Sequence, residues 1–146
     1  MGEIASAMAG HHAQCDDLFA AALIQASQGS WDNAASEFKH FHHEMEVHMG
    51  DEEAVLFPAF ESTTGMQAGP TTVMRLEHDR MRTLLTQIEL ALTARDAERL
   101  DGYMSTLLIL MRQHNLKEEN VLYAMLDAAL HDHAGELIAQ LGLGRK

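Results

Sequence analysis

The sequence contains little of several residue types, and each shortage narrows the class of protein. Its 146 residues include one cysteine, two prolines and 5% aromatic residues. The single cysteine, Cys15, cannot form an internal disulfide, which agrees with a reducing compartment. Residues that favour strands are sparse, whereas the helix-favouring alanine, leucine and methionine are plentiful. The composition therefore predicts helices.

Basic residues and long apolar runs are also scarce. No apolar run approaches the roughly 20 residues that a transmembrane helix needs. The start at Met1 lacks the basic and apolar stretches of a signal peptide. The formal net charge is −12, and so acidic a surface repels nucleic-acid phosphates and anionic membranes. We therefore expect a cytoplasmic protein that binds neither nucleic acid nor membrane.

The length suits one domain, residues 1–146, and 47% apolar residues argue against disorder. Apolar periodicity predicts a short extra helix near 133–141 and four long helices at about 4–28, 32–61, 70–94 and 97–128. Gly29, Pro70 and Asp96 lie at the breaks between the long helices. Short connections imply antiparallel neighbours, so we expect an all-α, up-down-up-down four-helix bundle that ends in the short extra helix.

Each predicted helix has an apolar stripe, and each stripe contains a histidine. In the fourth helix the stripe runs through His114 and Glu118 and continues to Val121 and Met125. Pro58 lies inside the second helix, where it should kink or end the helix. The fourth helix has alanine at the corresponding place, so no matching interruption is expected there.

The chain repeats itself with a constant difference of 66 in residue number, which relates 48 to 114 and 12 to 78. Each half is therefore a predicted helical hairpin with a histidine on its first helix and His-x-x-x-Glu on its second. In an antiparallel hairpin, residues equally far from the turn lie at the same height. The pseudo-twofold repeat thus places six side chains near one level of the bundle: His12, His48, Glu52, His78, His114 and Glu118.

These six side chains predict a metal site. Carboxylates and imidazoles that converge in an apolar interior are costly unless a cation pairs with them. Imidazole and carboxylate suit Fe, Mn and Zn. Two glutamates can bridge two ions, and two histidines can complete each one. A lone histidine on an apolar stripe is usually structural, but four at matched heights with two glutamates in register favour metal.

Other polar residues near the predicted site have open roles. A possible additional ligand, or a hydrogen-bond partner of a ligand, is one of four residues: His11, His43, Glu44 and Tyr123. The acidic residues that follow the two ligand glutamates, Glu53 and Glu119, are expected to face outward or pair with a neighbour. The tail histidines His131 and His133 are expected to be exposed.

Two segments resemble a known family. The eleven residues from His48, HMGDEEAVLFP, are similar to the second-helix signature of hemerythrin-like HHE domains. The ten residues from His114, HNLKEENVLY, resemble their fourth helix, and the surroundings of His12 and His78 resemble the first and third. The resemblance covers roughly residues 8 to 126. It implies two non-haem iron ions, with oxo or hydroxo and carboxylate bridges, in preference to Mn or Zn.

The sequence departs from the oxygen-carrying hemerythrins at two places. Their third helix has a second histidine one turn after the first, where this chain has Arg82. Their fourth helix has an aspartate five residues after its histidine, whereas Glu118 follows His114 by four. The chain is therefore closer to the broader HHE group, which is linked to iron-centre repair, nitric oxide response and iron sensing.

Three functions remain open at this point. The first is binding or sensing of a diatomic ligand, O2 or NO, by a di-iron centre. The second is an enzyme that acts on peroxide or NO, although no general acid or base beyond the ligands is recognisable. The third is iron storage or donation to damaged iron centres. A fourth interpretation is a purely structural zinc bundle, which would show no redox change. The oligomeric state is also open, and the chain could be a monomer or a homodimer.

Overall fold

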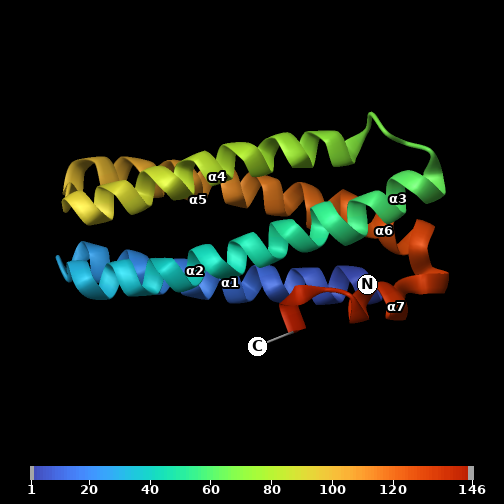
Figure 1. Cartoon of the computed structure of the whole chain (residues 1–146), viewed down its shortest axis with the longest axis horizontal. Helices are drawn as coiled ribbons and strands as arrows, with labels where there is room; N and C mark the ends of the chain where they lie inside the picture. Colours follow the sequence, from blue (N-terminus) through green and yellow to red (C-terminus); the bar gives the residue numbers. More distant parts are fainter. Residues whose placement is uncertain (1, 145–146) are drawn as a thin grey trace.

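The computed structural model describes residues 2–144, and these form helices with no strand among them. The predicted all-helical bundle is confirmed. The long helices form two neighbouring pairs, α1 with α2 and α4 with α5 (Figure 1). The α-helices of the bundle are α1 (Glu3–Ser27), α2 (Trp31–Asp51), α3 (Phe57–Thr64), α4 (Pro70–Ala94), α5 (Ala97–Lys117) and α6 (Tyr123–Leu130).

The turns use residues suited to their backbone conformations. Gly29 and Gly65 have positive φ angles of 70° and 74°, a region that glycine enters without steric cost. Pro70 is the first residue of α4, where its missing N–H costs no helical hydrogen bond. Asp96 caps α5 because its carboxylate accepts a hydrogen bond from the Arg99 backbone N–H. Figure 1 shows the α1–α2 turn and the α4–α5 turn at the same end of the molecule.

Two π-helical segments interrupt the long helices at equivalent places. They are η1 (Glu52–Leu56), between α2 and α3, and η2 (Glu118–Leu122), between α5 and α6. In each, an N–H donates to a carbonyl five residues earlier, from Phe57 to Glu52 and from Tyr123 to Glu118. The expectation that only the helix containing Pro58 is interrupted is therefore wrong, since η2 forms without a proline.

The π turn also corrects the predicted apolar stripe. One extra residue in the turn rotates the following residues, so the inward face moves by one position. Val121 is 56% exposed, whereas Leu122 and Leu126 are buried. The stripe predicted to continue to Val121 and Met125 is thus wrong beyond Glu118.

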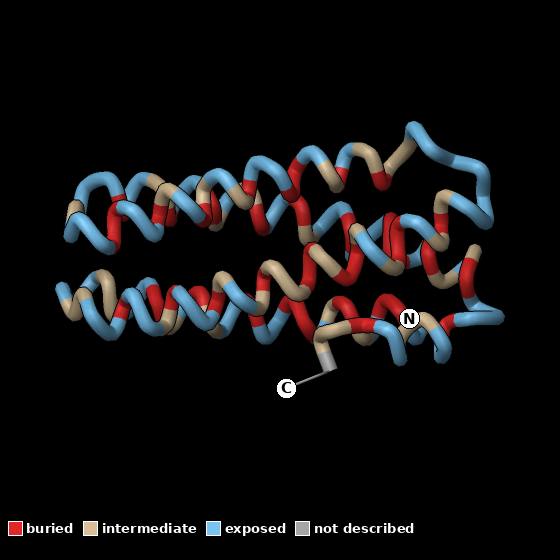
Figure 2. Tube along the Cα trace, viewed as in Figure 1, coloured by how far each residue is buried: buried red, intermediate tan, exposed pale blue. Residues whose placement is uncertain are grey.

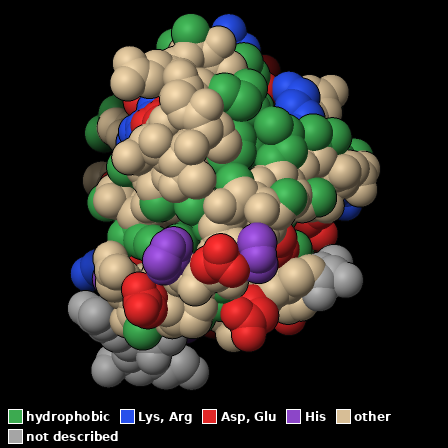
Figure 3. All heavy atoms as spheres, turned by 90° about the vertical axis from the view of Figure 1, so that its right-hand side faces the viewer, with side chains coloured by type: hydrophobic (Ala, Val, Ile, Leu, Met, Phe, Trp, Pro, Cys, Tyr) green, Lys and Arg blue, Asp and Glu red, His purple; other side chains and the backbone are tan. Residues whose placement is uncertain are grey.

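The C-terminal segment lies against α2 rather than extending away. In place of one helix over 133–141, the chain forms a 3-10 turn at His131–His133, α7 (Ala134–Ala139) and a second 3-10 turn at Gly142–Gly144. The Asp51 carboxylate accepts hydrogen bonds from the N–H groups of Gly142 and Leu143, at 2.6 and 3.1 Å. As expected, His131 and His133 are exposed. The end of the molecule that faces the viewer in Figure 3 carries histidine and acidic side chains on its surface.

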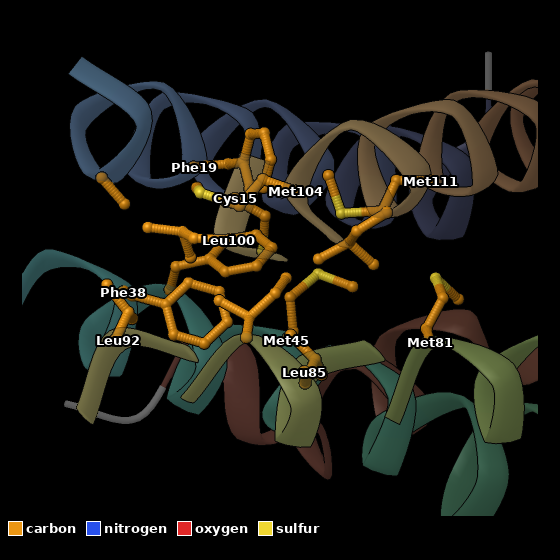
Figure 4. Packing of buried hydrophobic residues seen from close by; sticks show 14 of the residues in the cluster. Cys15, Phe19, Phe38, Met45, Met81, Leu85, Leu92, Leu100, Met104 and Met111 are labelled. Atoms are coloured by element: carbon orange, nitrogen blue, oxygen red, sulfur yellow. The ribbon is translucent and has the colours of Figure 1, made fainter. Parts of the chain in front are cut away.

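Two apolar clusters fill the bundle, and buried residues follow the inward sides of the helices (Figure 2). One cluster includes Phe19, Phe38, Leu85 and Leu100 and packs as shown in Figure 4. The other joins α1, α3 and α6 through residues such as Met8. Along the helices, the predicted ligands lie where one cluster gives way to the other, except His48, which lies between Met45 and Met49 of the first cluster. None of the described helices is long and apolar enough to span a membrane.

Candidate metal centre

The bundle brings all six predicted ligands into its interior. The four histidines come from the four long helices, one each, and the two glutamates begin the π segments. Each is at most 4% exposed. Their donor atoms form two groups within which all atoms lie within 4.8 Å of one another. One group contains His78, His114, Glu52 and Glu118, and the other contains His12, His48 and Glu118.

We name these groups the His78/His114 position and the His12/His48 position. Glu118 belongs to both, and its Oε1 lies 3.2 Å from His114 Nε2 and 3.1 Å from His12 Nε2. Glu52 also reaches both halves, because its Oε1 lies 3.1 Å from His78 Nε2 and 3.7 Å from His48 Nε2. Each carboxylate is therefore placed to contact two neighbouring cations.

The donor set fits a cation because several of its atoms have nothing else to bind. Among the described residues, the buried side-chain atoms without a hydrogen-bond partner are Glu52 Oε1, His78 Nε2, His114 Nε2 and Glu118 Oε2. All four belong to the His78/His114 position. Buried polar groups normally have partners, so atoms left without one point to an ion or an unseen ligand.

The two glutamates cannot both hold a negative charge in the metal-free interior. Burial raises the pKa of Glu52 well above its ordinary value, and the charge of Glu118 adds to this. Burial also disfavours the charge of Glu118, but hydrogen bonds from Glu52 and the surrounding histidines hold its pKa well below the ordinary value. The metal-free centre thus has one protonated and one ionised carboxyl, and cations would allow both to ionise.

Carboxylates outside the centre contact two of the ligand histidines. Glu53 Oε2 lies 2.7 Å from His78 Nδ1, and Glu119 Oε2 lies 3.0 Å from His12 Nδ1. Arg82 donates two hydrogen bonds of 2.9 Å to the Glu53 carboxylate. Such contacts favour the tautomer in which Nε2 is free to face a bound cation, and they would raise the basicity of a ligating histidine.

The other two histidines have dissimilar outer partners. His114 Nδ1 lies 2.8 Å from Glu77 Oε1, and Lys117 donates to the second oxygen of Glu77. His48 Nδ1 instead lies 3.0 Å from Nδ1 of His11. The other nitrogen of His11 lies 2.9 Å from Glu44 Oε2.

The comparisons with known proteins agree with this geometry. Residues 3–126 match the hemerythrin HHE cation binding domain. The chain belongs to the hemerythrin HHE family. No curated protein and no solved structure is similar enough to the chain to be matched. HHE domains bind metal cations, typically iron, and the two His/Glu groups of this chain could hold such ions.

Tyr123 lies inside the HHE centre, where sequence periodicity did not place it. Its hydroxyl donates to Glu118 Oε1 at 2.9 Å and to Glu52 Oε2 at 3.0 Å, as alternatives. It also lies 3.1 Å from His12 Nε2 and 3.2 Å from His48 Nε2. Burial raises the pKa of Tyr123 well above its ordinary value, and the nearby carboxyl groups add to this, so the hydroxyl keeps its proton.

The remaining candidates fall into two kinds. His11 and Glu44 contact the centre only through His48, as hydrogen-bond partners rather than direct members of either group. His43 is exposed and belongs to neither group. Cys15 is buried, and burial raises the pKa of its thiol to about 12, which disfavours the thiolate that binds metals.

The expectation that Glu53 and Glu119 face outward or pair with a neighbour is confirmed in its second form, since they pair with His78 and His12. Sequence reasoning did not identify these histidines as the neighbours, and it did not identify Glu77 as the partner of His114. Glu53 and Glu119 each follow a ligand glutamate, and Glu77 precedes His78. Glu53 and Glu119 could have been found because they differ by 66 in residue number, as the candidate ligands of the two halves do. Glu77 has no such signal, because the equivalent residue in the first half is His11.

Proposed function

We propose that this HHE protein holds two iron ions, one at each position, and binds a diatomic ligand, O2 or NO, at that centre. The observation that carries the proposal is the set of four buried donor atoms without partners, which converge beside a second group that shares Glu118. Imidazole and carboxylate ligands suit iron. Iron, when bound, supplies the capacity to bind and reduce O2 or NO.

The protein ligands leave room for such a molecule. The His12/His48 position offers two histidines and one carboxylate, a donor set that leaves open positions on a non-haem iron ion. Every ligand side chain is almost fully buried, so the interior favours a small, uncharged molecule over a bulky or charged one. We include in this proposal the up-down order of the helices and the pseudo-twofold repeat, which the paired contacts of Glu53 and Glu119 support.

The test is anaerobic loading with Fe(II), counting of bound iron, and visible spectra before and after O2 and then NO. We expect two irons per chain and a new absorption band that reverses when the gas is removed. His48→Ala and His114→Ala should each lower the iron content. His43→Ala is the matched control, because His43 is exposed and outside both groups. Unchanged iron content in both ligand variants would exclude the site.

A second candidate function is disposal of peroxide, and Tyr123 is the observation that favours it. Its hydroxyl is a proton donor that contacts both glutamates and two histidines of the centre. Conversion of two peroxide molecules to O2 and two waters needs proton transfer between oxygen atoms but no added reductant. The Tyr123 Oη, which keeps its proton at neutral pH, is placed to supply one.

Tyr123→Phe tests this second function. Phenylalanine is the natural residue at the equivalent place in the first half, Phe57, so the aromatic ring should be accommodated. Peroxide consumption should fall in Tyr123→Phe at equal iron content, and it should be unchanged in Tyr103→Phe, whose ring lies near the α4–α5 turn. Equal rates in both variants would leave gas binding as the function.

A further inference from the structure

The two halves of the centre differ in how they support the second-helix histidine. Glu77 contacts the outer nitrogen of His114. The repeat of 66 residues relates Glu77 to His11. Lys117, which holds Glu77, corresponds to Asp51, which instead binds backbone N–H groups of the C-terminal segment. His48 is therefore the one ligand histidine whose outer nitrogen lies against an imidazole.

This imidazole contact constrains the protons of both rings. For His48 Nε2 to offer a lone pair to an ion, the proton of His48 must be on Nδ1 and must donate to His11 Nδ1. His11 then carries its own proton on Nε2 and donates it to Glu44 Oε2, 2.9 Å away. In the reverse arrangement His11 donates to His48, and the His48 proton lies on Nε2, where it blocks an ion.

Glu44 selects between these two arrangements. An ionised carboxylate accepts hydrogen bonds and cannot donate them, so it favours the proton on His11 Nε2. The Glu44 side chain is 25% exposed, whereas that of His11 is 1% exposed. The orientation of a buried ligand thus depends on a partly exposed carboxylate through one intervening ring.

The support that reaches His48 is weaker than that of the other ligands. Hydrogen bonds to an ionised acceptor are roughly twice as strong as those between neutral groups. The outer nitrogens of His12, His78 and His114 each contact a carboxylate directly, and that of His48 contacts the imidazole of His11. His48 is therefore less strongly oriented and less basic than its three counterparts.

Tyr123 adds a second difference between the positions. Its hydroxyl lies within hydrogen-bond distance of Nε2 of both His12 and His48. These contacts must break before the two nitrogens can bind an ion. The equivalent residue, Phe57, stacks on His78 with ring centres 5.9 Å apart and has no hydroxyl. The inward nitrogens of His78 and His114 lie 3.1 and 3.2 Å from oxygens of Glu52 and Glu118, without the geometry of a hydrogen bond, so no tyrosine contact must yield there.

From these differences we infer that the two positions bind cations unequally. The His78/His114 position retains a divalent transition-metal ion, and the His12/His48 position exchanges its ion readily. His11 and Glu44 are positioning residues that hold His48 in the tautomer able to accept that ion. The inference rests on the proposed two-ion centre and adds a function to it, since an exchangeable ion can be donated to an acceptor.

The test measures both dissociation constants by anaerobic titration with Fe(II) against a competing chelator. In the wild-type protein we expect two separate constants. His11→Ala and Glu44→Gln should weaken the looser site about 10–100-fold and leave the tighter one unchanged. Glu77→Gln should instead weaken the tighter site. Glu37→Gln, on the same helix as Glu44 and outside both groups, is the matched control.

A spectroscopic measurement separates positioning from general damage to the fold. Nitrogen-15 NMR of the metal-free protein distinguishes a histidine protonated on Nδ1 from one protonated on Nε2. We expect His48 to be protonated on Nδ1 in the wild type and to shift towards Nε2 in Glu44→Gln, whose amide can donate to His11. The double variant His11→Glu with Glu44→Leu introduces the residues found at the equivalent positions of the second half, Glu77 and Leu110. It should lower the dissociation constant of the looser site.

The outcomes are distinguishable. If the wild-type protein binds no iron, both the proposed function and this inference are wrong. If it binds two ions but His11→Ala and Glu44→Gln leave both constants and the His48 tautomer unchanged, the two-ion centre stands and the inference alone is overturned. Loss of both ions to the same extent in Glu44→Gln would also overturn it.

Discussion

The carboxylate of Glu53 lies 2.7 Å from Nδ1 of His78, although the two residues belong to different helical hairpins. Arg82 fixes that carboxylate from the other side with two hydrogen bonds. Burial disfavours the charge of Glu53, but the hydrogen bonds from Arg82 and His78 lower its pKa overall. Glu53 is therefore ionised at neutral pH and oriented to support a ligand of the centre.

Glu53→Gln should weaken ion binding at the His78/His114 position about 10–100-fold, as outer-shell substitutions typically do. The neutral amide is a weaker partner for His78 Nδ1 and a poorer one for Arg82. Competition with a zinc chelator measures the change. Glu61→Gln is the control, because Glu61 also accepts a hydrogen bond from an arginine, Arg75, but belongs to neither ligand group. Equal affinity in the two variants would contradict this role.

The metal-free protein should lose stability as the pH falls below neutrality, in part because of His48. Burial lowers the pKa of His48 from 6.5 to about 3, and the neighbouring charges of Glu118, His12 and His11 only partly offset one another. Between these two pKa values the unfolded chain binds a proton at this residue and the folded chain does not, so unfolding is favoured. From pH 7 to pH 4.5 the loss should be about 2–3 kcal/mol.

Urea denaturation of the metal-free protein at pH 7 and pH 4.5 measures this loss. His48→Gln should reduce the difference in unfolding free energy between the two pH values, since glutamine does not titrate. His43→Gln should leave it as in the wild type, because His43 is exposed. The assignment to His48 is wrong if its variant shows the wild-type pH dependence.

Binding of a divalent cation at pH 7 should release protons. Burial raises the pKa of Glu52 well above its ordinary value, so its carboxyl is protonated before the ion binds. Burial opposes a charge on His114, but the nearby carboxylates of Glu118 and Glu77 outweigh it and raise the pKa of His114, which adds to the bound protons. Both groups must lose these protons to act as ligands.

Calorimetric titration with Zn2+ in two buffers of different ionisation enthalpy counts the released protons. We expect about one proton or more per chain, from Glu52 with a contribution from His114. The same apparent enthalpy in both buffers would show that no proton leaves. That result would contradict the protonated state of Glu52 in the metal-free centre.

The convergence of the six candidate ligands could be predicted from the sequence because it depends on regular helix geometry. His48 and Glu52, like His114 and Glu118, are four residues apart and share a face of an α-helix. The equal lengths of the two hairpins then place the histidines of different helices at one height. These relationships need only the rise and turn of a helix and the positions of the breaks.

Tyr123 was harder to place because it follows the point at which helix geometry changes. Five residues of α-helix turn the chain by about 500°, which would set Tyr123 about 140° away from Glu118. In the π segment η2 the Tyr123 N–H donates to the Glu118 carbonyl, which brings the two residues to one face. Neither composition nor periodicity marks a π turn, so the sequence left Tyr123 as one of several open candidates.

The last prediction concerns Asp127, which joins the last helix of the bundle to the first. Its carboxylate accepts hydrogen bonds from the N–H groups of Ile4 and Ala5, at 2.9 and 3.0 Å. These N–H groups lie in the first turn of α1, where no helical partner exists and a negative charge is favourable. Asp127→Ala should therefore lower the free energy of unfolding by about 1 kcal/mol, within the range for helix caps.

Urea denaturation measures this loss, and the dependence of the unfolding free energy on urea concentration should be unchanged. Asp132→Ala is the control, because Asp132 is exposed. Iron content should stay at the wild-type level, because His12 lies about two turns further along α1 than the capped residues. A loss of iron together with stability would mean that the start of α1 positions His12. A variant as stable as the control would mean that water replaces the carboxylate at this helix end.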